Sequence, residues 1–134
     1  MISKKLKKFI EETNLAFVAS ADQRSRPHLA ASRGLKVPDA EHVVFEAWFC
    51  RQTLENVAEV PRVAVAVIDA ASGGGYQLVG TVEKVIPIGI LDGFAPEVEA
   101  PGTPQVESRM LVRVEEVMEF STGAHTDHPI TPNS

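Results

Sequence analysis

The chain has 134 residues, a length that fits one domain, and 44% of them are hydrophobic, which is enough for a core. Its formal net charge of −5 argues against binding to nucleic acid, because most of the surface would repel a phosphate backbone. The single cysteine, Cys50, excludes an intramolecular disulfide and a cysteine-based metal cluster. No segment approaches the roughly 20 apolar residues of a membrane span or resembles a signal peptide, so we expect a cytoplasmic protein.

The N-terminal segment is predicted to form a helix that docks on the rest of the domain. Leu6, Phe9 and Ile10 share one face. Ile2 lies one turn earlier, and Ser3 can cap the start. The lysines precede the glutamates, against the helix dipole, so the helix must be stabilised by packing rather than by propensity.

The middle of the chain alternates between short apolar runs and turn-rich polar stretches, which predicts strands joined mostly by hairpins. A change to helical spacing before Pro61 predicts one short helix between the third and fourth strands. Gly80 inside a strand suggests a bulge or a close backbone approach. The expected strands are 15–21, 27–37, 42–48, 62–69, 76–86 and 106–120, and the expected inserted helix is 51–60. This order implies a mainly β, antiparallel six-stranded barrel and not a βαβ sheet.

The last third of the chain divides into a loop, a strand and a tail. Residues 87–105 contain four prolines and three glycines, a composition typical of a loop. We therefore expect a single domain over residues 1–121 and a flexible polar tail over residues 122–134. His125, Asp127 and His128 are metal ligands by residue type, but a tail without a fixed third ligand predicts no metal site.

The junction between the third strand and the inserted helix is a candidate anion site. It carries Arg51, Gln52 and Thr53. A helix N-terminus has unpaired N–H groups and a partial positive charge, so an arginine and a hydroxyl beside it favour phosphate. From periodicity alone, the simpler interpretation that Thr53 merely caps the helix is preferred.

Two further features of this region have more than one explanation. The strand 26–36 is rich in small residues, which leave space for a flat ligand but equally suit an edge strand or a strand facing another subunit. Cys50 lies where a thiolate is favoured, although a small apolar packing role is expected. Trp48 suits the core, a ligand ring or a subunit interface.

Taken in order, these segments resemble the FMN-binding split barrels of the pyridoxamine 5′-phosphate oxidase-like superfamily. The resemblance covers residues 15–86, from FVAS through a hairpin ending in RPH to the strand VVFEAW, the turn RQT and the strand YQLVGTVEKV. Its most specific part is ENVAEVPRVAVAV, a helix with an asparagine followed by Pro-Arg-Val and a valine-rich strand. The resemblance implies a split β-barrel with FMN at the interface of a homodimer.

The resemblance also implies which residues hold the cofactor. The phosphate is expected at Arg51, Gln52 and Thr53. The ring is expected between the second strand and the end of the third, with one residue approaching from the fifth; the residues are Ala31, Ser32, Arg33, Glu46, Ala47, Trp48 and Gln77. The family commonly has lysine or arginine at the position of Gln52. Its true pyridoxamine phosphate oxidases have a basic C-terminal region, whereas this tail has no lysine or arginine, so that activity is not expected.

Two functions follow from the resemblance. The first is a flavin-dependent oxidoreductase that acts on an unidentified small substrate, in which Arg33 and Glu46 are the charged residues near the predicted ring. The second is a non-enzymatic flavin-binding protein or electron carrier. A third and weaker alternative is a barrel that binds another cofactor, such as haem or a deazaflavin, or no cofactor.

Overall fold

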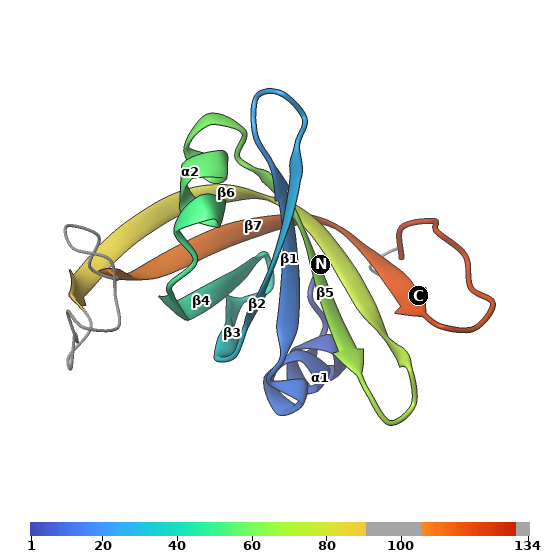
Figure 1. The fold of residues 1–134 in the computed structure, drawn as a ribbon. Coiled ribbons are helices and arrows are strands. Elements are labelled where there is room, and N and C mark those ends of the chain that lie inside the picture. Colours follow the sequence, from blue (N-terminus) through green and yellow to red (C-terminus); the bar gives the residue numbers. More distant parts are fainter. Residues whose placement is uncertain (91–105, 131–134) are drawn as a thin grey trace.

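The computed structural model describes residues 1–90 and 106–130 and shows one antiparallel sheet with two helices (Figure 1). The sheet has 7 strands in the order β2-β1-β5-β6-β7-β4-β3, so β2 and β3 are its edges. The helices are α1 (Lys4–Thr13) and α2 (Arg51–Glu59). The strands are β1 (Ala16–Ala21), β2 (Pro27–Ser32), β3 (Leu35–Asp39), β4 (His42–Trp48), β5 (Arg62–Asp69), β6 (Gly74–Ile90) and β7 (Val106–Ser121). The predicted mainly β, antiparallel class is confirmed. Neither helix is long and apolar enough to cross a membrane.

Helix α1 forms as its sequence predicts. The Ser3 hydroxyl accepts a hydrogen bond from the Leu6 N–H at 3.1 Å, which confirms the predicted cap. Ile2, Leu6 and Ile10 are buried in the core. The ring of Phe9 meets that of Tyr76 edge-on, with centroids 5.3 Å apart. The apolar face of α1 therefore anchors the helix to the sheet.

The predicted second strand, residues 27–37, is two strands, and this raises the number from six to seven. The break falls at Arg33 and Gly34. Gly34 has a φ of +84°, a backbone conformation that residues with a Cβ rarely adopt. The Gly34 N–H donates to Asn14 Oδ1 at 2.9 Å, which ties this corner to the end of α1. After the corner the chain pairs with β4 instead of β1.

Strand β6 is longer than predicted, because it continues to Ile90 through Pro87. Its pairing with β5 ends at Arg62–Thr81, and beyond that point β7 is the only strand within the described residues that pairs with it. A proline is tolerated where one edge of a strand has no neighbour, so Pro87 does not end the strand. Residues 91–105 of the predicted loop lie outside the described residues.

Gly80 confirms the predicted bulge and close approach. The β6–β7 register shifts between Val79 and Gly80, and a Cβ on Gly80 would lie 2.2 Å from the Arg113 carbonyl oxygen. Any larger residue would therefore push β6 and β7 apart.

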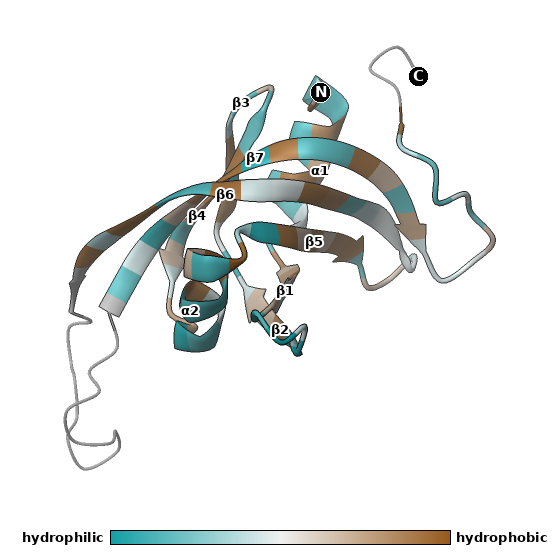
Figure 2. Cartoon of the chain, turned by 90° about the horizontal axis from the view of Figure 1, so that it is seen from above, coloured by the Kyte–Doolittle hydropathy of each residue, from teal (hydrophilic) through white to brown (hydrophobic). Residues whose placement is uncertain are grey.

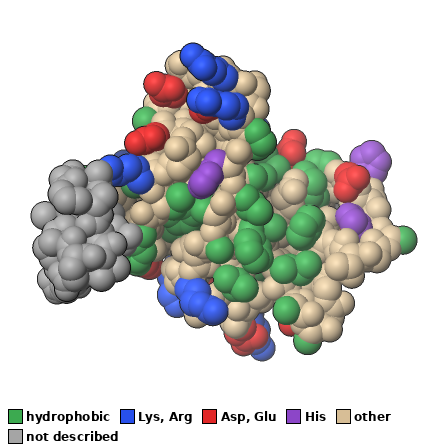
Figure 3. All heavy atoms as spheres, in the orientation of Figure 1, with side chains coloured by type: hydrophobic (Ala, Val, Ile, Leu, Met, Phe, Trp, Pro, Cys, Tyr) green, Lys and Arg blue, Asp and Glu red, His purple; other side chains and the backbone are tan. Residues whose placement is uncertain are grey.

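The sheet curves around a core and has an inner and an outer side. The alternation of hydrophobic and hydrophilic residues along β6 and β7 is visible in Figure 2. One register row on the inner side consists of the buried residues Val18, Val65, Leu78 and Val117. The neighbouring positions point outward, where Figure 3 shows hydrophobic side chains across the middle of the view. Both sides therefore carry apolar residues, but only the inner side is covered by the described chain.

The segment after β7 continues without a helix or strand over residues 122–130. It contacts the domain at Ile130, whose N–H donates to the Val117 carbonyl oxygen at 2.6 Å. This part of the tail therefore lies against β7.

Candidate functional site

Helix α2 begins with an uncapped terminus. Its N-cap residue is Cys50, whose side chain makes no capping hydrogen bond. Arg51 and Gln52 are exposed, whereas Thr53, the third helical residue, is fully buried at 0% exposure. The interpretation of Thr53 as the helix cap is therefore wrong, because the helix starts one turn earlier. The Thr53 hydroxyl has no hydrogen-bond partner among the described residues.

A line of polar side chains fastens α2 to the inner side of β1. Gln52 Nε2 donates to Asn56 Oδ1 at 2.9 Å, and Asn56 Nδ2 donates to Ser20 Oγ at 3.0 Å. Asn56 and Ser20 are buried. Because buried polar groups are costly without partners, these bonds fix how α2 is turned, and they leave Arg51 facing outward.

A pocket of about 270 Å³ opens beside this line; its lining residues are Asp22, Arg26, Pro27, His28, Gln52 and Asn56. Asp22 Oδ2 lies 2.6 Å from Arg26 Nε. The backbone N–H of Arg26 holds the pKa of Asp22 below its ordinary value, with support from its guanidinium and from the Arg24 N–H. The charge of Arg26 is thus already paired. Arg51, in contrast, makes no ion pair with any described residue.

His28 on β2 lies beside Cys50 at the start of α2. Its Nε2 lies 3.3 Å from Cys50 Sγ, and both side chains are half-buried. Cys50 also packs against the core, as its residue type predicts. His28 was not singled out from the sequence. The available signal was the alternation His28, Ala30, Ser32, which places these residues on the inner side of β2.

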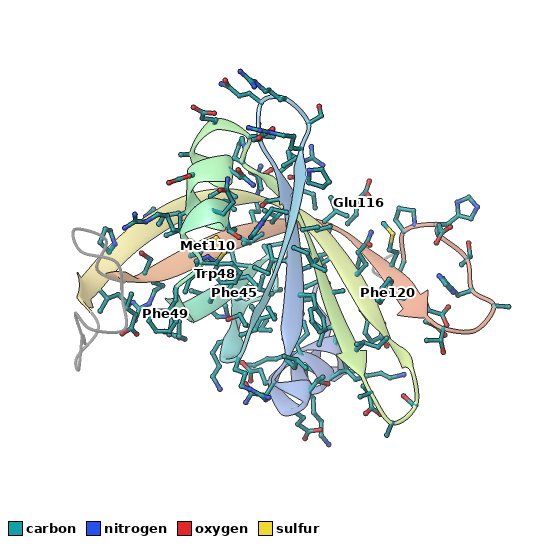
Figure 4. The ribbon with its side chains drawn as sticks, in the orientation of Figure 1. Phe45, Trp48, Phe49, Met110, Glu116 and Phe120 are labelled. Carbon is teal, nitrogen blue, oxygen red and sulfur yellow. The ribbon has the colours of Figure 1, made fainter. Side chains whose placement is uncertain are left out.

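Trp48 is part of the core. Its side chain is 1% exposed, and its ring meets that of Phe45 edge-on with centroids 5.0 Å apart. Figure 4 shows both rings beside the start of α2, together with Met110. Trp48 Nε1 donates to the Cys50 carbonyl oxygen at 3.0 Å. The indole therefore positions the start of α2 and offers no exposed face to a ring.

The other residues predicted near the ring lie at separate places. Glu46 and the adjacent Ala47 are half-buried on β4, and Glu46 Oε2 lies 3.2 Å from Arg109 Nε. The Ser32 hydroxyl donates to the Arg33 carbonyl oxygen at 3.0 Å. Arg33 is exposed at the β2–β3 corner and lines a pocket of about 480 Å³ near α1.

Ala31 and Gln77 lie on the outer side of the sheet. One register row crosses β2, β1, β5, β6 and β7 and contains Ala31, Phe17, Ala66, Gln77 and Met118. Gln77 Nε2 donates to Met118 Sδ at 3.3 Å. Because α2 is bonded to Ser20 on the inner side, a single chain does not bring the start of α2 and this outer row together.

The fold and these residues can be compared with known proteins. Residues 2–116 match the family described as pyridoxamine 5′-phosphate oxidase. The chain belongs to this family. Among its relatives is an uncharacterized protein of Methanocaldococcus jannaschii, 29% identical over 116 residues, with 84% of this chain and 76% of the relative covered.

Two of the solved structures with the same fold serve as comparisons. HupZ of Group A Streptococcus is similar with a TM-score of 0.70 and 23% identity, covering 94% of this chain and 99% of HupZ. An FMN-binding protein from Syntrophomonas wolfei subsp. wolfei is similar with a TM-score of 0.65 and 10% identity, covering 90% and 87%. At these identities the likeness shows the fold alone.

Proposed function

We propose that this member of the pyridoxamine 5′-phosphate oxidase family binds FMN with the phosphate at the start of α2 and uses it as an oxidoreductase on a small substrate. The observation that carries the proposal is Arg51. Its guanidinium is exposed at a helix N-terminus and has no ion pair within the described residues. The FMN-binding protein of the same fold supports the choice of ligand.

The residues at the start of α2 fit a phosphate group. The N–H groups of the first helical turn lack intrahelical partners, and the earliest helical bond, from Leu54 N–H to the Cys50 carbonyl, is long at 3.4 Å. Arg51 adds a full charge, and the Gln52 amide lies beside it. Thr53 contributes its backbone N–H, since its hydroxyl is buried. The helix terminus and Arg51 therefore supply most of the phosphate binding.

A second copy of the chain is the proposed partner, and it would cover the outer side of the sheet. The apolar outer residues include Leu29, which is 66% exposed, and Phe120, at 36%. The others in this group are Phe17, Ala19, Ala31, Ala64, Ala66, Val79 and Met118. An apolar surface of this kind is typical of an interface. A homodimer also explains why Ala31 and Gln77 lie on the opposite side of the sheet from α2.

The chain's own residues bind and orient the cofactor, and FMN supplies the transfer of hydride or electrons when bound. Near the predicted ring, Glu46 is held by Arg109, so its carboxylate is oriented and partly neutralised. Arg33 is exposed at the corner after β2, where its charge favours an anionic ligand. Phosphorylated pyridoxine is not the proposed substrate, because the C-terminal tail has no lysine or arginine to bind its phosphate.

Absorbance spectroscopy of the purified protein tests this function. We expect a flavin spectrum, bleaching of that spectrum by NADH or NADPH, and repeated turnover when a small acceptor is added. Bleaching without turnover would instead make the protein an electron carrier. A protein that shows no flavin spectrum after addition of FMN would contradict the proposal.

A further inference from the structure

The single cysteine of the chain is paired with a histidine from another element. Cys50 ends the connection between β4 and α2, and His28 lies on β2, yet Cys50 Sγ and His28 Nε2 are 3.3 Å apart. A thiol and an imidazole at this distance can share one proton. The thiolate is the nucleophilic form of cysteine, and both a helix N-terminus and a neighbouring imidazolium favour it.

A second observation comes from Thr53. N-cap and third-position side chains of a helix are neighbours, and in many helices each caps the other's backbone. Here the Cys50 side chain makes no capping bond, and the fully buried Thr53 hydroxyl has no partner among the described residues. The Cys50 side chain therefore has no capping bond that competes with its contact to His28. His28 also lines the pocket of about 270 Å³, together with Gln52 at the start of α2.

We propose that Cys50 and His28 form a reactive thiol–imidazole pair that exchanges with low-molecular-weight disulfides. The Cys50 thiol proton passes to His28 Nε2, and the sulfur attacks one sulfur of the disulfide. The disulfide's S–S bond breaks as the new S–S bond forms, and the leaving thiolate takes the proton from His28. Cys50 is oxidised, one sulfur of the small disulfide is reduced, and one free thiol is released.

The surroundings of the pair favour a disulfide that carries carboxylates. Arg51 follows Cys50 directly and is without an ion pair in the described chain, and the α2 terminus adds partial positive charge. An anionic thiol attached to Cys50 would therefore lie beside Arg51. If the phosphate of FMN binds there, a consequence that rests on the proposed function, the mixed disulfide and FMN exclude each other.

The reaction of the apoprotein with oxidised glutathione tests the proposal, followed by intact-protein mass spectrometry at pH 7. Because Cys50 is the only cysteine, a gain of one glutathionyl group reports on this site alone. An isolated thiol is only a few per cent thiolate at this pH, so we expect the folded protein to react about tenfold faster than the chain unfolded in urea. His28→Gln and His28→Ala should remove this advantage, whereas His125→Gln in the tail should keep it.

The native-to-unfolded ratio needs no variant, so the test stands even if a His28 variant fails to fold. A folded parent that reacts no faster than the unfolded chain would overturn the proposal, as would a folded His28→Gln variant that reacts at the parental rate. Added FMN should slow the reaction more than riboflavin does. If FMN has no effect while the dependence on His28 holds, the thiol site stands and the phosphate assignment fails.

Discussion

The outer side of the sheet has two parts, and they differ in whether their side chains already have partners. The apolar part, over β1, β2, β5 and the adjoining ends of β6 and β7, exposes Leu29 and Phe120 to solvent. The charged part, at the start of β4 and in the middle of β6 and β7, is bonded to itself. There His42 Nδ1 lies 2.9 Å from Asp39, and His42 Nε2 lies 2.6 Å from Glu83.

The charged part continues along β7 in the same manner. Arg113 Nη1 lies 3.9 Å from Glu83, and Arg62 Nη1 lies 3.9 Å from Glu115. The Thr81 hydroxyl donates to Glu115. Charged side chains that form ion pairs within one chain need no partner from a second copy. Exposed apolar side chains, in contrast, are stabilised when another surface covers them. The contrast therefore supports the proposal that a second copy covers the apolar part and that the charged part stays in solvent.

The largest expected effect is on assembly. Leu29→Glu places a charge in the proposed interface, and burying an unpaired carboxylate costs several kcal/mol, so dimer affinity should fall by about a hundredfold or more. Light scattering and analytical ultracentrifugation measure this. Glu83→Gln in the charged part is the matched control and should leave the dimer unchanged. A parent protein that is monomeric with flavin bound would contradict the interface.

A smaller effect is expected from the polar line beneath α2. Asn56→Ala leaves the buried Ser20 hydroxyl without its donor, which should lower the free energy of unfolding by about 1–3 kcal/mol. Urea denaturation measures it, and the exposed neighbour Glu55→Ala should change it by less than about 0.5 kcal/mol. Equal effects of the two substitutions would show that the Asn56–Ser20 bond does not hold α2.

The smallest expected effect comes from His42 and depends on pH. Hydrogen bonding to Asp39 is the main cause that raises the pKa of His42 above its ordinary 6.5; Glu83 adds to it and desolvation opposes it. The stabilisation is therefore fully present below pH 6.5 and is lost as the pH rises through the folded-state pKa. The Glu41 backbone N–H and, after it, the His42 ring N–H lower the pKa of Asp39 from its ordinary 3.8, so its contribution is lost only as the pH falls below that value.

The melting temperature of His42→Gln should thus fall furthest below that of the parent near pH 5 to 6 and approach it above pH 8. The loss should stay under about 1 kcal/mol, because exposed ion pairs contribute little. His125→Gln serves as a matched histidine control. A difference in melting temperature between the parent and His42→Gln that grows as the pH rises would contradict a stabilising role of protonated His42.

Local signals account for the parts of the fold that the sequence predicts. The Ser3 cap, the apolar face of α1 and the bulge at Gly80 each depend on residues close in the chain or on one backbone contact. The sequence does not predict the split of the second strand, because Gly34 follows the small residues 30–32 and does not stand out from them as a corner. The sequence predicts the end of this strand before Pro87, because the absence of a second neighbouring strand on one side of β6 is a property of the whole sheet.

The candidate site was predictable only where its features depend on residues close in the chain. The start of α2 and its exposed arginine follow from spacing and turn chemistry. The burial of Thr53 and Trp48 follows from how α2 is turned by the Asn56–Ser20 bond and from packing against Phe45. The pairing of His28 with Cys50 joins elements that are 22 residues apart. No local pattern encodes such contacts.

The most direct test of the central claim is a fluorescence-quenching titration of apoprotein with FMN and with riboflavin, which lacks the phosphate. A charge-assisted contact contributes about 1.5–3 kcal/mol, so Arg51→Ala should weaken FMN about tenfold to a hundredfold and leave riboflavin unchanged. Gln52→Lys should tighten FMN by adding a charge beside the phosphate, and Arg24→Ala in the β1–β2 hairpin should alter neither ligand. Equal weakening of both ligands by Arg51→Ala, or no binding of FMN to the parent, would contradict the account.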